Sequence, residues 1–307
     1  MSAKLVDLAA TPPPADWGVV VDHDAIGALA DRWVDDAFPL PAFDYPGTPT
    51  NRDESTWFDY VVRAVSVLAC LWPPEGEAMW AVEHDGVWLD DAPGIFATCS
   101  RQLADPDYQL FAGRGTLQLI PERLAILEQV DQVIADRWQG TALNLVAEAD
   151  RNGTKIAAAL TETMPGYYDR PTTELGVLPF DKLSHLAAAI MAAGVGWSKA
   201  GFTGYDDFPV YPDYMLPRVF RHTGVMVYEP ALADRIDRRQ LIEADSNEEH
   251  ALRWATVYSG AALRAALAER GNPVTAPALD YRLWFEAVLG PDADSFGEHH
   301  RTVTLRY

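Results

Sequence analysis

Apolar side chains recur every three or four residues along most of the chain, the spacing that places them on one face of an α-helix. Between Asp24 and Asp35, for example, Ile26, Leu29 and Trp33 fall on one side. Clusters of glycine and proline, which interrupt helices, separate the segments with this spacing. The pattern predicts helices at about residues 24–35, 55–71, 92–105, 121–137, 141–150, 153–163, 180–193, 212–223, 230–237, 247–269 and 278–289.

Strict alternation of apolar and polar residues is clear in one place. Between Met79 and Leu89, two short alternating runs flank Asp85-Gly86, and this dipeptide is typical of the tight turn of a β-hairpin. The sequence therefore predicts a mainly α protein with a small β-hairpin insertion near residues 79–89.

The size of the chain bounds its domain organisation. It has 307 residues, of which 49% are hydrophobic, and ten of them are tryptophans. That is enough apolar surface for one large domain or two small ones. The sequence has no internal repeat, low-complexity tract or clear linker, so we expect a single helical domain over residues 18–307. Residues 1–17, which carry three consecutive prolines, are expected to be a loose lead-in.

The charge balance argues against nucleic acid as a partner. Acidic residues outnumber basic ones by 45 to 24, which gives a formal charge of −21. Binding to a polynucleotide requires Lys and Arg side chains to replace its counterions. We therefore expect no polynucleotide partner. A phosphorylated small molecule would need a pocket that is locally basic.

Cysteine content and hydropathy bear on location. Cys70 and Cys99 are the two cysteines, too few for a disulfide framework, as is typical of a reducing cytoplasm. The first 17 residues lack the apolar core of a signal peptide. The longest apolar run, residues 186–197, is too short to span a bilayer. We expect a cytoplasmic protein without a membrane partner. The sequence does not indicate its oligomeric state.

Most motifs with a known chemistry are missing. No GxxxxGK[ST] phosphate loop and no GxSxG nucleophile motif occur. The seven histidines show no metal-ligand spacing, and the adjacent pair His299-His300 is not a metal motif. We therefore expect no metal site. The acidic residues of segment 243–249 are expected to be a solvated helix start, with Ser246 or Asn247 as the N-cap.

Asp213 is the most informative acidic residue. It lies between Pro212 and Tyr214, in a segment rich in prolines and aromatic residues. A carboxylate in these surroundings is partly desolvated and rigidly held, which suits an acid that faces a developing positive charge. The position also suits an ordinary helix N-cap, because Pro217 would fall in the first turn or so.

Two further segments place polar groups beside aromatic ones. Lys182 and His185 lie one helical turn apart and so share a face. Asp280 precedes Tyr281 and Trp284, which are three residues apart. The alternatives are a surface lysine whose stem covers apolar surface, and a helix N-terminus with core aromatic residues.

These residues belong to short blocks that occur in a fixed order. Met164–Asp169 (MPGYYD) is similar to the block FPSFRD, and Leu279–Trp284 (LDYRLW) is close to IDYYLW. Both blocks are typical of the queuosine-salvage family, the queuosine 5′-phosphate N-glycosylases/hydrolases, which the chain resembles from about Val21 to Tyr307. The other matching blocks are Trp72 with Trp80–Glu83, Phe96–Cys99, Gly140–Asn144, Phe180–Lys182, Phe202–Pro217, Ser246–Glu249 and His300–Thr302.

The resemblance implies a fold, an activity and a site. The fold would be similar to that of helix-hairpin-helix DNA glycosylases. The activity would be hydrolysis of the N-glycosidic bond of a free queuosine 5′-monophosphate, which releases the 7-deazaguanine base queuine without a metal or organic cofactor. Asp213 matches the catalytic acid, and Lys182 matches a lysine expected near the ribose phosphate. The expected substrate-binding residues are Trp72, Phe180, His185, Asp207, Tyr214, Arg218, Asp280, Tyr281 and Trp284.

The residue types agree with that chemistry. Cleavage of an N-glycosidic bond gives the sugar oxocarbenium character. A desolvated carboxylate stabilises this cation and orients a water molecule, and a nearby cation holds a phosphate. Aromatic side chains such as Trp72, Tyr214 and Trp284 can stack on a flat base.

The chain also departs from the family pattern at several positions. Leu68 and Ala69 stand where the family has Asn and Phe, and His185 stands where it has Gln. Leu183 and Met215 replace further family residues. These changes leave two alternatives open: a relative repurposed for another modified nucleoside, and a non-catalytic nucleotide-binding protein on the same scaffold.

Overall fold

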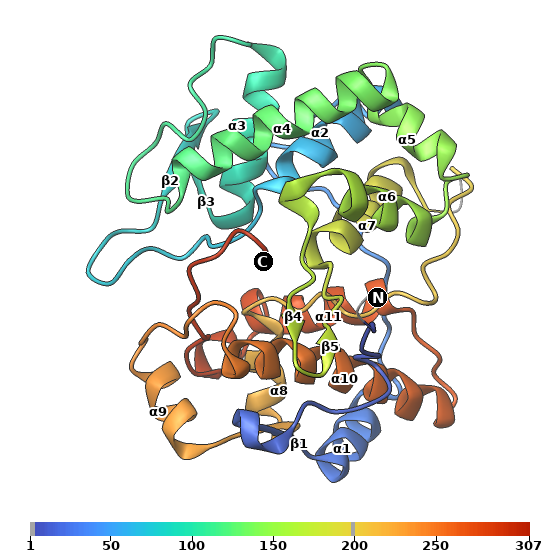
Figure 1. Cartoon of the computed structure of the whole chain (residues 1–307), viewed down its shortest axis with the longest axis vertical. Helices are drawn as coiled ribbons and strands as arrows, with labels where there is room; N and C mark the ends of the chain where they lie inside the picture. The colour runs from blue at the N-terminus through green and yellow to red at the C-terminus, as the bar shows by residue number, and fades with distance from the viewer. Residues whose placement is uncertain (1–3, 198–199) are drawn as a thin grey trace. The chain divides into compact units, whose positions relative to one another are not determined.

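Helices make up most of the regular structure in the computed structural model, which describes residues 4–197 and 200–307 (Figure 1). Each predicted helix is present in these residues, within a few residues of its expected position, so the mainly α prediction is confirmed. The helices are α1 (His23–Trp33), α2 (Glu54–Ser66), α3 (Asp91–Ala104), α4 (Ile120–Trp138), α5 (Ala142–Glu148), α6 (Gly153–Thr163), α7 (Lys182–Val195), α8 (Leu216–His222), α9 (Pro230–Asp237), α10 (Asn247–Glu269) and α11 (Ala276–Val288).

The end of α2 differs from the prediction. The helix ends at Ser66 rather than near residue 71. Cys70 has a φ of 49°, in the left-handed region that an α-helix cannot include. The buried guanidinium of Arg123 donates hydrogen bonds to the carbonyl oxygens of Val67, Ala69 and Cys70. These carbonyls therefore have partners without a continued helix.

Three small antiparallel sheets occur in the described chain, each with two strands. The predicted hairpin is confirmed as β2 (Ala81–His84) and β3 (Val87–Asp90), joined by Asp85 and Gly86 with positive φ angles. The sheets β1 (Val19–Val21) with β6 (Met226–Tyr228), and β4 (Thr172–Thr173) with β5 (Gly176–Val177), were not predicted. Their strands are too short to show an alternating pattern. Short 3₁₀ turns lie at Ala15–Trp17, Pro165–Tyr167 and Ala293–Ser295.

The chain divides into two compact units, each built from separate segments. Unit 1 comprises residues 1–41, 169–182 and 205–303, and unit 2 comprises residues 42–168, 183–204 and 304–307. Lys182, the first residue of α7, belongs to unit 1, and the rest of α7 belongs to unit 2. The single domain expected over residues 18–307 stays a prediction.

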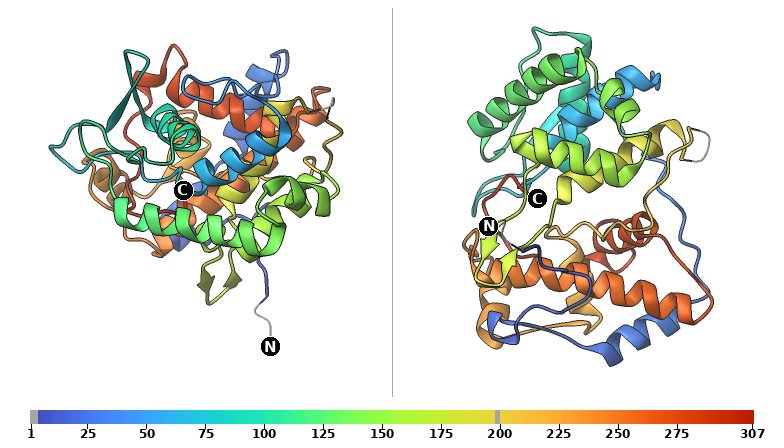
Figure 2. Two further views of the ribbon diagram at one scale, coloured as in Figure 1. Left: turned by 90° about the horizontal axis from the view of Figure 1, so that it is seen from above. Right: turned by 45° about the vertical axis from the view of Figure 1, so that its right-hand side comes forward.

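α10 is the central helix of unit 1. It packs against α1, α8 and α11, and lies beside α1 in both directions of view (Figure 2). Leu252, Ala255 and Leu263 of α10 are buried in one apolar core with Ile26 and Leu29 of α1. Burial of such side chains is the main favourable term that holds the helices together.

The N-terminal segment is better anchored than expected for a loose lead-in. Residues 1–3 lie outside the described residues, but from Lys4 onward the chain makes defined contacts. The backbones of Lys4 and Val6 hydrogen-bond to Val177 of β5, each at 2.9 Å. Trp17 is buried, and the indole of Trp254 donates to the carbonyl oxygen of Thr11 at 2.7 Å.

Unit 2 forms around α2, which packs against α3, α4 and α5. Trp57 of α2 is fully buried, and its indole N–H donates to the carbonyl oxygens of Ile190 and Met191 in α7. α7 contains most of the longest apolar run of the sequence. Neither it nor any other helix in the described residues is long and apolar enough to cross a membrane.

Candidate active site

Asp213 binds the backbone at the start of helix α8 through one of its carboxylate oxygens. Oδ1 accepts hydrogen bonds from the backbone N–H of Met215 at 2.7 Å and of Leu216 at 3.0 Å. These bonds explain why α8 begins at Leu216, later than the pattern predicts, since the chain around Asp213 forms a capping turn instead. The half-buried carboxylate is thus fixed in orientation by the backbone. The N-cap position of α8 is Met215, so Asp213 is not the N-cap residue and closes the turn before the helix instead. Both bonds use Oδ1, so they do not conflict with a chemical role for Oδ2.

Lys182 and Asp213 influence each other electrostatically. Lys182 is only 6% exposed, and burial lowers the pKa of its ammonium group, while the negative charges of Asp213 and Asp280 oppose this shift. Burial raises the pKa of the Asp213 carboxyl group, and the positive charge of Lys182 opposes that shift. A snorkelling surface lysine is therefore the wrong interpretation of Lys182. The structure brings a buried cation and a constrained carboxylate together in unit 1.

Asp280 of α11 is the third charged group of this cluster. It is 8% exposed, and its Oδ1 accepts a hydrogen bond of 2.6 Å from the backbone N–H of Tyr211, two residues before Asp213. Burial raises the pKa of Asp280 well above its ordinary value, and the negative charge of Asp213 adds to the rise. Asp280 therefore ties the loop that carries Asp213 to α11.

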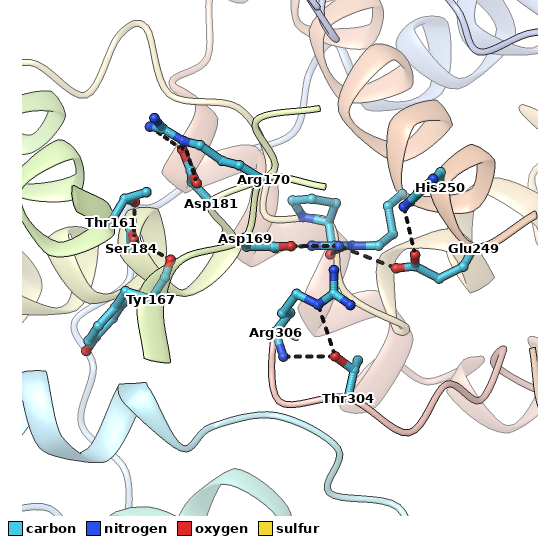
Figure 3. Close-up of polar contacts among 12 residues, drawn as sticks. Thr161, Tyr167, Asp169, Arg170, Asp181, Ser184, Glu249, His250, Thr304 and Arg306 are labelled. Carbon is cyan, nitrogen blue, oxygen red and sulfur yellow. Dashed lines mark hydrogen bonds and ion pairs between the residues drawn. The ribbon is translucent and has the colours of Figure 1, made fainter. Parts of the chain in front are cut away.

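A buried arginine, which sequence reasoning missed, lies behind the loop. Arg253 of α10 is 0% exposed, and its Nε–H donates to the carbonyl oxygen of Pro212 at 3.2 Å. The guanidinium also forms ion pairs with Asp169 and Glu249, both of which are labelled in Figure 3. Its central carbon lies 4.0 Å from the ring centroid of Phe180. Arg253 thus contacts both segments that lead to the candidate catalytic residues.

The sequence did carry a signal for Arg253. It is the one charged residue in the segment 251–257 (ALRWATV). Every residue of this segment is buried in α10. An unpaired cation in such a run would be costly, so it must have an acidic partner elsewhere. Asp169, which supplies that partner, is 84 positions away in the sequence.

A second ion pair, between Arg170 and Asp181, fixes the residue directly before Lys182. Arg170 donates from Nε to Asp181 Oδ2 at 2.8 Å and from Nη2 to the same oxygen at 2.7 Å (Figure 3). The backbone N–H groups of Phe180 and Asp181 both donate to the carbonyl oxygen of Asp169. The residues before Lys182 are therefore fixed to the chain that precedes β4.

Comparison with known proteins shows which family the chain belongs to. The family model described as queuosine salvage protein matches residues 96–307, more than two thirds of the chain. The chain belongs to the queuosine salvage protein family. A queuosine 5′-phosphate N-glycosylase/hydrolase from Sphaerobacter thermophilus is 29% identical over 313 residues, which cover 94% of this chain and 93% of the relative. The resemblance drawn from the sequence blocks is thereby confirmed.

Two mammalian proteins of the same name are also similar. The one from Bos taurus is 25% identical, and the alignment covers 55% of this chain and 52% of that relative. The one from Mus musculus is 23% identical and covers 62% of this chain and 59% of its own. The region matched by the queuosine salvage model includes Asp169, Lys182, Asp213, Arg253 and Asp280.

Other residues expected to bind substrate lie in unit 1 of this queuosine salvage protein. Tyr214 packs against His299 with ring centroids 4.8 Å apart. Tyr281 and Trp284 stack on each other, with centroids 6.2 Å apart and an interplanar angle of 20°. Phe180 is buried beneath Arg253. The structure shows packing contacts for these aromatic residues, and their role in substrate binding stays a prediction.

Asp207 and Arg218 have surroundings that suggest other roles. Asp207 is exposed, and its charge acts on Arg264. Arg218 donates to the carbonyl oxygens of Ala287, Ala293 and Gly297, at 3.0 to 3.1 Å. The bonds of Arg218 anchor the loop after α11. A role of Asp207 or Arg218 in substrate binding stays a prediction.

Trp72 and His185 belong to unit 2, whereas Asp213 and Lys182 belong to unit 1. Trp72 is buried, and its carbonyl oxygen accepts a hydrogen bond of 2.8 Å from Gln118. His185 is half-buried on α7. Leu68 and Ala69, which depart from the family pattern, are also buried in unit 2.

A surface pocket in unit 2 contains none of the predicted site residues. Asp59, Arg63 and Asp131 are among the residues that line it. Arg63 is ion-paired with Asp131, and Asp59 accepts hydrogen bonds from Thr141 and the backbone of Ala142 at the start of α5. The polar groups of this pocket therefore have structural roles.

Proposed function

We propose that this chain hydrolyses the base–ribose bond of a free queuosine-type nucleoside 5′-monophosphate. Its relatives are named queuosine 5′-phosphate N-glycosylase/hydrolase. The observation that carries the proposal is the position of Asp213: its Oδ1 is bound by two backbone N–H groups, and its charge interacts with Lys182 and Asp280.

Asp213 would act on the sugar through Oδ2. As the bond between C1′ and the base nitrogen breaks, its electron pair leaves with the base, and positive charge develops on the ribose ring. A fixed carboxylate stabilises this charge because it needs no reorganisation during the reaction. The same oxygen can accept a hydrogen bond from the water that attacks C1′. The water proton passes to the carboxylate or solvent, and the base leaves after taking up a proton.

Lys182 would hold the 5′-phosphate. A buried ammonium group is a strong partner for a phosphate, because little water competes for it. The chain as a whole carries a formal charge of −21 and therefore repels anions at long range. A local cation is needed to offset this repulsion, which supports an assignment of Lys182 to the phosphate.

Three broader features belong to the same proposal. We infer that the helical fold is similar to that of helix-hairpin-helix DNA glycosylases, that the protein acts in the cytoplasm, and that its substrate is a free nucleotide rather than a polynucleotide. The acidic charge supports a free nucleotide as the substrate. Binding to a polynucleotide is favoured by the release of its counterions, and an acidic protein does not displace them.

The test is a product assay with the purified chain. Queuosine 5′-phosphate, queuosine and the ordinary ribonucleoside monophosphates are incubated separately, and released base is measured by liquid chromatography with mass spectrometry. We expect queuine and ribose 5-phosphate from the queuosine nucleotide, slower release of queuine from queuosine, and no base from the ordinary ribonucleotides. Tight binding of that nucleotide without release of base would instead support the non-catalytic binding protein. Release from a different modified nucleotide would support the repurposed relative.

A further inference from the structure

Three potential metal ligands meet at the start of α10, apart from the Asp213 cluster. His250 Nε2 lies 3.5 Å from Glu249 Oε2 (Figure 3). The same nitrogen lies 3.7 Å from Asp245 Oδ1. The three ligand atoms all lie within 4.8 Å of one another, and the structure gives no other such group in the residues it describes. Two ligand atoms of a tetrahedral zinc ion are about 3.4 Å apart at ordinary bond lengths. The side chains therefore already have nearly the required separation.

Two of these side chains are buried, and each has a possible ligand atom that makes no hydrogen bond. His250 is 3% exposed and Glu249 is 2% exposed. In the part of the chain that the structure describes, neither ring nitrogen of His250 nor Oε2 of Glu249 has a hydrogen-bond partner. Buried polar atoms in native proteins are nearly always satisfied, by protein, water or a bound ion. His250 and Glu249 are an exception, and their unsatisfied atoms are possible metal ligands: Nε2 of His250 lies 3.5 Å from Oε2 of Glu249.

The charges nearby leave room for a cation. Arg253 pairs with both Asp169 and Glu249, so two carboxylates share one guanidinium. This leaves one negative charge before Asp245 is counted. Glu249 uses Oε1 toward Arg253, at 3.4 Å, and directs Oε2 toward His250.

We propose that Asp245, Glu249 and His250 form a binding site for a divalent transition-metal ion, with Zn²⁺ as the best fit. One imidazole nitrogen and two carboxylate oxygens suit zinc, whereas Mg²⁺ and Ca²⁺ prefer oxygen ligands alone. A water molecule would complete the tetrahedron on the side of the exposed Asp245. The ion would tie the residue before the Ser246 N-cap to the first turn of α10. It takes no part in the proposed hydrolysis, and the proposal does not depend on that function.

The test is zinc binding by the full chain after treatment with a chelator. Zn²⁺ is titrated in competition with a chromogenic chelator, for the wild type and for the variants Asp245→Asn and His250→Gln. We expect one bound ion per chain and a loss of affinity of at least about tenfold in each variant. Glu249 is left unchanged, because it also pairs with Arg253.

A matched control comes from the β2–β3 hairpin. His84 Nε2 also lies 3.7 Å from a carboxylate oxygen, that of Asp85, but this pair is not part of a three-ligand group in the described residues. His84→Gln should therefore bind Zn²⁺ like the wild type. Since Asp245 is exposed, Asp245→Asn should fold normally, which circular dichroism verifies. Wild-type affinity in Asp245→Asn, or no bound ion in the wild type, would overturn the proposal.

Discussion

Arg253 donates its Nε–H to the carbonyl oxygen of Pro212, the residue directly before Asp213, over 3.2 Å. The side chain that fixes the candidate catalytic loop is therefore itself buried in the central helix of unit 1. Its remaining nitrogens are engaged by Asp169 and Glu249. Stability and site geometry are linked through this one guanidinium.

Arg253→Met should strongly destabilise the protein. The change leaves Asp169 and Glu249, both 2% exposed, without their cation. Removing one partner of a buried ion pair costs about 3–5 kcal/mol of the free energy of unfolding. Urea denaturation of the variant and the wild type measures this difference.

The control for Arg253→Met is Arg238→Met, which breaks an exposed ion pair with Asp234 one turn away on the same part of the chain. Exposed pairs contribute about 0–1 kcal/mol. Similar small losses in both variants would show that the buried network does not stabilise the fold.

Asp213→Asn should preserve the fold and abolish most turnover. The amide oxygen can still accept the N–H groups of Met215 and Leu216, but the charge that opposes the oxocarbenium ion is gone. We expect kcat to fall by about 10²–10³ or more, with little change in substrate affinity. Asp206→Asn, at an exposed position of the preceding loop, should keep wild-type kcat. Equal turnover in the two variants would remove Asp213 from the reaction.

Lys182→Ala should erase the preference for a 5′-phosphate. If the ammonium group holds the phosphate, KM for queuosine 5′-phosphate rises while KM for queuosine hardly changes. Lys155→Ala removes a lysine that is exposed and paired with Asp150 in unit 2, and it should alter neither constant. A parallel rise of both KM values in Lys182→Ala would indicate a general loss of structure instead.

Asp280→Asn should change how stability depends on pH. An acid whose pKa is raised in the folded state holds its proton more tightly there than in the unfolded chain. Its contribution to stability is present at low pH and is lost as pH rises through the folded pKa. Asn does not titrate and can still accept the Tyr211 N–H.

The free energy of unfolding of Asp280→Asn, relative to that of the wild type, should therefore increase between about pH 4 and pH 7. Denaturant titrations at several pH values in this range measure the trend. A constant difference, or one of opposite slope, would show that Asp280 is not a carboxyl group with a raised pKa.

Leu68 and Ala69 should affect which base is preferred. We expect Leu68→Asn combined with Ala69→Phe to gain activity on queuosine 5′-phosphate, because the pair restores the family's amide and ring. Both positions are buried, so the new ring can also cost about 1–3 kcal/mol through overpacking, and stability is measured in parallel. A wild type that cleaves this nucleotide well, with a folded variant that is worse, would make these two differences neutral repacking.

The helices could be predicted because their apolar spacing is local. The early end of α2 could not, since it depends on Arg123, which is 53 or more positions away from the carbonyl groups that it binds. β1 and β6 escaped for a similar reason: Val19 pairs with Tyr228 across most of the chain. Short elements stabilised by distant partners leave no periodic pattern.

The candidate site was partly visible in the sequence. The prolines and aromatic residues around Asp213 indicated a constrained carboxylate, and the ordered blocks connected it with Lys182. Arg253 was missed because its partners are distant. The acidic start of α10 was expected to be solvated, with Ser246 or Asn247 as the cap. Ser246 does cap the helix, but Glu249 is buried, because its side chain pairs with the buried Arg253.

The way unit 1 is divided along the chain has a consequence for biosynthesis. More than 120 residues separate its first segment from its second. Lys182 lies in the second segment, and Asp213 and Asp280 lie in the third. On the ribosome, Lys182 emerges long before α11 has been made. Contacts between distant segments form slowly, and incomplete chains expose apolar surface. The core of unit 1 therefore stays unfinished, with its apolar surface exposed, until α10 and α11 have been made.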